Sequence, residues 1–159
     1  MVEPMANQNC FKFEQDFVEG LRCIPMKVRF KLDTCGVKLK LNHWNQFSYE
    51  ERQALLEMPC ESAQTTNAYR EHLQTLVMQY AGTPASILPI DPLPAWQDPT
   101  QLPEQVTAQA TQHQLTITPT QWAHLTALKR FALIKLSQPG HENRNFLPAM
   151  AEFGLVQEG

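Results

Sequence analysis

Residues 37–58 read VKLKLNHWNQFSYEERQALLEM, and residues 115–136 read LTITPTQWAHLTALKRFALIKL. Aligned without a gap, the two segments superpose four pairs of identical residues at fixed spacing: Trp44 on Trp122, Arg52 on Arg130, Ala54 on Ala132 and Leu55 on Leu133. We expect each Trp to anchor a helix with a buried Leu/Ile/Met stripe, and each Arg to bind a carboxylate or a helix C-terminus. The alignment predicts an internal repeat. The alternative is that two amphipathic helices look alike because Leu and Ala recur in helices.

Helix signals lie on both sides of a proline-rich stretch. In the first half they are a helix of about ten residues from Phe13, a capping box at Ser48–Glu51, and an apolar stripe from Tyr69 to Tyr80 closed by Gly82. In the second half, a capping box at 118–121 opens a helix predicted to run to about Ser137. We therefore predict a mainly α fold in a single domain, residues 1–159, with similar helical halves at 11–82 and 104–155.

Two interpretations remain open for residues 26–41. As a helix, the segment has Pro25 at its first position and Gly36 just past its end, with Val28, Leu32 and Cys35 on one stripe. As a strand, apolar and polar residues alternate from Met26. The punctuation at both ends favours the helix. The strand interpretation gives an alternative α+β fold with a small hairpin at 26–41.

Six prolines fall between Thr83 and Pro103, where neither a helix nor a central strand can persist. We predict a stiff linker with polyproline character at 83–103. Trp96 within it either folds back on the core or serves as an exposed anchor for a partner.

The charge of the chain is unevenly distributed. The 159 residues carry a net charge of −3, but six basic residues and one acidic residue give the segment from Arg22 to Lys40 a local charge of +5. This segment either keeps an apolar stretch soluble or docks onto an acidic partner or a phosphate-bearing cofactor. Nucleic acid is a weaker candidate, because no recognised motif accompanies the charge. The predicted partner-binding residues here are Arg22, Lys27, Arg29, Lys31, Lys38 and Lys40.

The four cysteines, Cys10, Cys23, Cys35 and Cys60, contain no C-x-x-C pair and fit reduced thiols. Cys23 and Cys35 are weak candidates for metal ligands, since their spacing is not that of a zinc knuckle. No catalytic motif stands out, so we expect a protein that is not an enzyme and carries no cofactor.

The polar stretch His141–Phe146 lies between two predicted helices. Asn145 is placed to cap the second of these helices. Alternatively, the loop is a recognition element, with Asn143 and Arg144 as partner-binding residues.

Two stretches resemble the nitrate reductase associated protein family of cyanobacteria and some other bacteria. They are FEQDFVEGLRCIPMKVRFKLDTCGVKLKLNHWNQFSYEERQALLEMPC and QWAHLTALKRFALIKLSQPGHENRNFLPAMAEFGL. The resemblance runs from about Phe13 to Leu155, with the proline-rich middle outside it. RCIPM-x-VRFKLD and HENRNF are its most specific pieces.

The resemblance implies an accessory protein that acts in maturation or assembly of assimilatory nitrate reductase, by docking on the immature enzyme. Components of molybdenum cofactor assembly are further possible partners. The alternative is a carrier that holds a metal cluster or an anionic molybdenum-pterin cofactor. No apolar run suits a membrane span or a secretion signal, so we expect a cytoplasmic protein without membrane contact.

Overall fold

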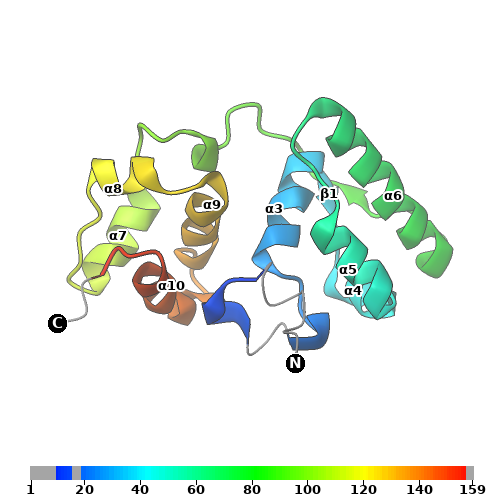
Figure 1. Cartoon of the computed structure of the whole chain (residues 1–159), viewed down its shortest axis with the longest axis horizontal. Helices are drawn as coiled ribbons and strands as arrows, with labels where there is room; N and C mark the ends of the chain where they lie inside the picture. Colours follow the sequence, from blue (N-terminus) through cyan, green and yellow to red (C-terminus); the bar gives the residue numbers. More distant parts are fainter. Residues whose placement is uncertain (1–9, 16–18, 157–159) are drawn as a thin grey trace, which may run out of the picture. The chain divides into compact units, whose positions relative to one another are not determined.

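The computed structural model describes residues 10–15 and 19–156 of the chain. These residues are mainly helical, as predicted, and their sheet consists of two short strands (Figure 1). The chain divides into two compact units that meet in sequence between Ile90 and Asp91: unit 1 is residues 1–90 and unit 2 is residues 91–159. Within the described ranges, no helix combines the length and the apolar character that a membrane crossing requires.

Unit 1 is built from helices and one strand pair. The predicted first helix falls partly on residues 16–18, outside the described ranges, and short 3-10 turns lie on both sides of them. The elements of unit 1 are η1 Lys12–Glu14, η2 Glu19–Leu21, α3 Met26–Cys35, β1 Val37–Lys38, α4 Leu41–Gln46, α5 Tyr49–Glu57, α6 Ala63–Ala81 and β2 Ser86–Ile87.

The helical interpretation of residues 26–35 is confirmed. Pro25 is the N-cap of α3 rather than its first residue, and Gly36 follows the helix with φ 77°. Gly36 N–H donates to Leu32 O at 2.9 Å, which closes the last turn. No hairpin forms within 26–41. Instead, β1 pairs antiparallel with β2, with Val37 opposite Ile87.

The core of unit 1 gathers the apolar faces of α3, α4, α5 and α6. Trp44, Leu55, Tyr69 and Leu73 are fully buried in it. The capping box that opens α5 is confirmed, since Ser48 Oγ accepts from Glu51 N–H at 3.1 Å and a Glu51 carboxylate oxygen accepts from Ser48 N–H at 2.8 Å. The stripe predicted on α6 is buried apart from its last member. Tyr80 is exposed, and its hydroxyl donates to Glu51 at 2.7 Å.

All the described secondary-structure elements of unit 2 are helices, joined by turns and loops. Its elements are η3 Ala95–Gln97, α7 Glu104–Gln112, α8 Pro119–His124, α9 Ala127–Leu136, η4 His141–Asn145 and α10 Phe146–Glu152.

The helix predicted from 118 to about Ser137 is wrong in one respect: it is two helices. The capping box at its start is confirmed by Gln121 N–H donating to Thr118 Oγ1 at 3.1 Å and Thr118 N–H donating to Gln121 at 2.9 Å. The chain then turns extended at Leu125 (ψ 151°), and Thr126 caps a new helix by accepting from Lys129 N–H. A side-chain cap in mid-segment therefore restarts the helix in a new direction.

The linker at 83–103 stays a prediction: the boundary between the two units lies within this segment, which contributes an element to each unit. Its first part contributes β2 to unit 1. Its second part contributes η3, which packs on α9 in unit 2, where the rings of Trp96 and Phe131 meet edge to face at 5.0 Å. Of the two roles considered for Trp96, the structure thus shows the one in which it folds back on the core.

The element boundaries recur at a fixed interval. α8 begins and ends 78 residues after α4, and α9 begins 78 residues after α5. α7 also begins 78 residues after α3, outside the aligned segments. The repeat of 37–58 in 115–136 stays a prediction, and these equal intervals are the structural observation that supports it.

Candidate docking surface

Most of the predicted basic residues reach solvent from unit 1. Arg22 follows η2, Lys38 lies on β1 and Lys40 is the N-cap of α4, and all three are exposed. Lys27 and Arg29 lie on α3 and are half-buried. We name these five residues together the basic face of unit 1. They come from the turn after η2, from α3, from β1 and from the N-cap of α4, and they are five of the 13 basic residues of the chain.

Lys31, the sixth predicted residue, does not belong to this face. Its side chain is only 6% exposed. Its Nζ donates to the carbonyl oxygens of Leu56, at 2.7 Å, and Met58, and it lies 5.5 Å from the centre of the Tyr69 ring. These carbonyls end α5, where the helix dipole favours a cation. Lys31 therefore joins α3 to the C-terminus of α5 and cannot contact a partner.

Burial shifts the ionisation of Lys31. Loss of water around the ammonium, and to a lesser degree the nearby charge of Lys27, lower its pKa from 10.5 to about 8. Cys60, Glu61 and Glu57 act in the opposite direction. The sequence held a signal for this burial, because position 31 completes the i, i+3, i+4, i+7 stripe of Val28, Leu32 and Cys35. The charge pattern alone predicted an exposed side chain at position 31, because lysine is mostly exposed in proteins.

Two further predicted residues lie in unit 2. Arg144 is exposed. Asn143 is half-buried, and its amide donates to Leu136 O at 3.1 Å and Gln138 O at 3.3 Å while accepting from Gln109 at 2.9 Å. It thus satisfies carbonyls at the C-terminus of α9. The capping role predicted for Asn145 is wrong, since its side chain makes no cap hydrogen bond with α10.

In unit 1 the Trp–Arg pair holds the end of α4. Arg52 Nε donates to Trp44 O at 3.0 Å, and Nη2 donates to Asn45 O at 3.0 Å. Leu21 O accepts both from Arg52 Nη1, at 3.1 Å, and from the indole of Trp44, at 2.8 Å. The guanidinium also lies 5.9 Å from the Trp44 ring centre. Of the two partners predicted for the Arg, the helix C-terminus is therefore the one observed.

The pair in unit 2 makes corresponding contacts. Arg130 Nη1 donates to Trp122 O at 3.3 Å and Leu125 O at 2.6 Å, at the end of α8. Its Nε donates to Trp96 O at 2.7 Å. The indole of Trp122 donates to Asp98 O at 3.2 Å. In each unit, then, one Trp and one Arg join the end of a short helix to the chain segment that precedes the helices.

Burial favours the protonated thiol at Cys10, Cys35 and Cys60. Cys35 and Cys60 are buried, and burial raises the pKa of Cys35 to about 11 and also raises that of Cys60. Burial likewise raises the pKa of Cys10 to about 12. Among the described residues, no three His, Cys, Asp or Glu side chains gather in a way that could hold a metal ion.

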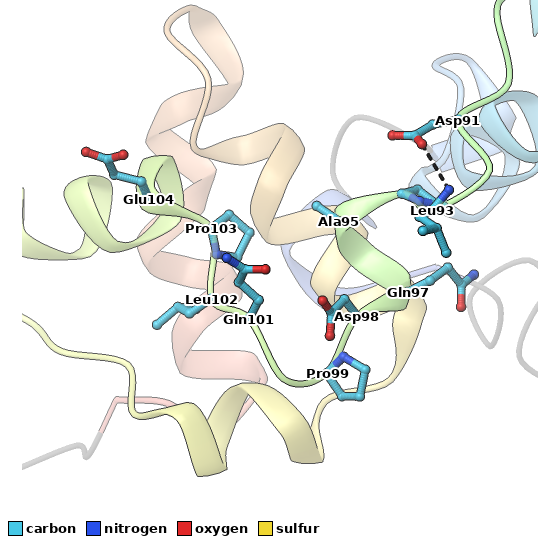
Figure 2. Close-up of a pocket in the computed structure, with 11 residues that line it drawn as sticks. Asp91, Leu93, Ala95, Gln97, Asp98, Pro99, Gln101, Leu102, Pro103 and Glu104 are labelled. Carbon is cyan, nitrogen blue, oxygen red and sulfur yellow. Dashed lines mark hydrogen bonds between the residues drawn. The ribbon is translucent and has the colours of Figure 1, made fainter.

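Unit 2 has an open groove of about 630 Å3 along its proline-rich segment. Figure 2 shows its lining residues, all of which come from the stretch between Asp91 and Glu104. Asp91 accepts from Leu93 N–H at 2.9 Å, and hydrogen bonds from Thr100 lower the pKa of Asp98. The charged lining residues of this described stretch are three carboxylates, those of Asp91, Asp98 and Glu104. Such a groove repels an anionic pterin, so it lends no support to a carrier of that cofactor.

Comparison with known families gives a match, which covers nearly the whole chain. A family model described as conserved nitrate reductase-associated protein matches residues 10–153. The chain belongs to this nitrate reductase-associated family. The match confirms the resemblance and extends it, because it also covers the proline-rich segment. Comparison with curated proteins and with solved structures found no match.

All the candidate residues of this nitrate reductase-associated protein fall inside the matched range, from Arg22 of the basic face to Arg144. Both Trp–Arg pairs do so as well. The family description indicates association with nitrate reductase, which is consistent with an accessory role. It assigns no individual residue, so roles for residues rest on the geometry above.

Proposed function

We propose that this protein assists the maturation or assembly of assimilatory nitrate reductase by docking on the immature enzyme through the basic face of unit 1. The observation that carries the proposal is the match to the nitrate reductase-associated family over residues 10–153. The accessory protein contributes binding, and the reductase contributes the chemistry. Arg144 in unit 2 is a second proposed contact, because it is exposed.

The charge distribution supports docking on an acidic surface. Five basic residues of one short stretch reach solvent to different degrees, while the chain as a whole has a net charge of −3. A concentrated patch of one sign attracts a complementary surface and increases the association rate. The attraction weakens with salt, since the Debye length shortens from about 10 Å at 0.1 M to about 3 Å at 1 M.

The direct test is binding to purified nitrate reductase at increasing salt, measured by surface plasmon resonance. We expect a complex that weakens as salt rises. The double variant Lys38→Glu/Lys40→Glu reverses two exposed charges and should abolish binding at moderate salt. Lys31 is left unchanged in this design, because reversing a buried lysine would unfold the protein.

The matched control is Lys12→Glu/Lys135→Glu, which has the same net charge but leaves the basic face intact. Circular dichroism checks that both variants fold. Equal binding by both double variants would refute docking through the basic face. A wild-type protein that never binds the reductase would refute the accessory function itself.

The maturation role is tested in cells. Nitrate reductase purified from cells with and without this protein is assayed for molybdenum and iron per polypeptide. We expect lower cofactor content without the protein, and recovery with the wild type but not with Lys38→Glu/Lys40→Glu. Unchanged cofactor content would show that docking serves something other than maturation.

A further inference from the structure

The outer edge of β2 has backbone groups directed away from β1. Leu88 N–H donates to Gly36 O at 2.8 Å, so the neighbouring pair of Val37 and Ile87 is a pair without mutual hydrogen bonds. In an antiparallel ladder the N–H and C=O of such residues point to the opposite side of their strand. Ile87 therefore presents both groups along the outer edge of β2.

The same edge is already closed two residues earlier. Ala85 N–H donates to the Gln74 amide at 2.8 Å, and Gln74 donates back to Ala85 O at 3.0 Å. The Gln74 side chain, which belongs to α6, thus takes the place of a third strand, but only at Ala85. No side chain in the described part of the chain makes the equivalent bonds to Ile87. Unprotected edges of this kind are templates for an additional strand.

Apolar surface accompanies this open edge. The Ile87 side chain is 84% exposed and that of Ile90 is 52% exposed. The segment is packed where it leaves β2, because Leu88 O and the Ile90 side chain lie so close to Gly36 that a Cβ there would meet them at 2.8 Å and 2.7 Å. An extended segment packed in this way would bind an added strand with a smaller entropic cost than a free loop.

The charges around the outer edge of β2 indicate which kind of partner segment would bind there. Lys38 lies opposite Ser86 in the ladder, and Lys40 follows it. The two stretches that form this region, 34–49 and 82–90, contain no acidic residue. The acidic residues that flank these stretches are Asp33 and Glu50 in unit 1 and Asp91 in unit 2, whose carboxylate accepts from Leu93 N–H. A second copy of the chain would bring lysines towards lysines, whereas an acidic segment would complement them.

We propose that the outer edge of β2 at Ile87 binds an extended acidic segment of a partner protein as an added strand. Backbone hydrogen bonds to Ile87 would set the register, its side chain would supply apolar contact, and Lys38 and Lys40 would attract the acidic residues. The inference rests on the proposed function, in which that partner is nitrate reductase, and it specifies how the basic face is used.

The test compares Ile87→Pro with Ile87→Ser in binding to nitrate reductase. Proline removes the outward N–H without removing a bond to β1, so the ladder survives. We expect Ile87→Pro to weaken binding by roughly tenfold or more, and Ile87→Ser, which keeps the N–H, to weaken it less. The matched control is Leu93→Ser, because Leu93 is 87% exposed but lies in unit 2 outside any strand. Thermal unfolding of each variant shows whether the fold is retained.

The outcomes separate this inference from the proposed function. If Lys38→Glu/Lys40→Glu weakens binding but Ile87→Pro does not, the added strand is wrong and the docking proposal stands. If Ile87→Pro unfolds the protein, the test becomes a comparison of Ile87→Ser and Leu93→Ser in their binding to nitrate reductase. Equal binding by these two variants refutes the added strand. Sedimentation of the wild type alone gives a further check. A dimer that Ile87→Pro dissociates would show that a second copy occupies the edge, and would overturn the acidic partner.

Discussion

Arg52 donates from Nε to the carbonyl oxygen of Trp44, eight residues earlier in the chain, at 3.0 Å. The contact runs from the second helix of a pair back to the end of the first, so it fixes the turn between α4 and α5. Arg130 makes the corresponding bond to Trp122 O in unit 2. Because guanidinium is a planar fork with five donors, one side chain reaches carbonyls that diverge at a helix end.

Replacing either of these two arginines should destabilise the protein, but to different extents. Arg130 is 7% exposed, so Arg130→Met leaves buried carbonyls without donors and should cost about 3 kcal/mol. Arg52 is half-buried, water can replace part of its bonding, and Arg52→Met should cost about 1.5 kcal/mol. Urea unfolding followed by circular dichroism measures both. An Arg130→Lys variant as stable as the wild type would show that charge alone, and not the fork, is what matters.

The buried ammonium of Lys31 should make stability depend on pH with a definite sign. Its pKa is about 8 in the folded protein against an ordinary 10.5, so between these values the unfolded chain binds a proton that the folded chain does not. Raising the pH in this window therefore stabilises the fold, by at most about 1.4 kcal/mol per pH unit. Below pH 8 the penalty is fully present.

The measurement is the free energy of unfolding of the wild type minus that of Lys31→Met, from pH 7.5 to pH 9 in steps. The subtraction removes groups that titrate in both proteins. We expect the difference to rise with pH. A flat or falling difference would mean that the ammonium is not desolvated in the folded state.

Two glycines with nearly the same backbone offer a matched pair. Gly36 has φ 77° and Gly82 has φ 80°, so alanine is strained at either position. Nothing lies within 4 Å of a Cβ at Gly82, whereas at Gly36 the Cβ would meet Leu88 O and Ile90. Gly82→Ala should cost about 1 kcal/mol, and Gly36→Ala clearly more, since the segment after β2, at Leu88 and Ile90, must shift. Thermal unfolding compares them, and equal losses would disprove the close approach of that segment to Gly36.

The thiols should differ in reactivity. Cys35 has a pKa of about 11, which leaves about one thiolate per thousand molecules at pH 8, and both Cys35 and Cys60 are buried. Cys23 is half-buried. Labelling with a disulfide reagent, located by mass spectrometry, should modify Cys23 directly and Cys35 and Cys60 no faster than the protein unfolds. Rapid labelling of Cys35 in the folded protein would reveal a reactive thiolate at that position.

Local signals in the sequence were sufficient where a helix begins or ends. The capping boxes at Ser48 and Thr118 and the stop at Gly82 are confirmed, because each depends on residues within one turn. The break at Thr126 was predictable too, since the alignment sets it on Ser48, which opens a helix. The prediction of one continuous helix from 118 to about Ser137 did not use the alignment of Thr126 with Ser48.

Features that depend on distant contacts were not predictable in the same way. Lys31 is buried because the end of α5 offers carbonyls to its ammonium, a partner 25 residues away in sequence. Asn145 was predicted to cap α10, but its side chain makes no such bond. Asn143 instead bonds to Leu136 O at the end of α9, because the turn at Gly140 brings it back to that helix. The strand partner of residues 37–38 lies beyond α6, and proline-rich composition gave no sign of it.

Every hydrogen bond described for a Trp–Arg pair stays on one side of the boundary between Ile90 and Asp91. Arg52 and Trp44 bond to Leu21 and the end of α4, while Arg130 and Trp122 bond to Trp96, Asp98 and the end of α8. A protease cut at this boundary would sever none of them. Each fragment would retain its own Trp–Arg pair, together with all the hydrogen bonds described for that pair.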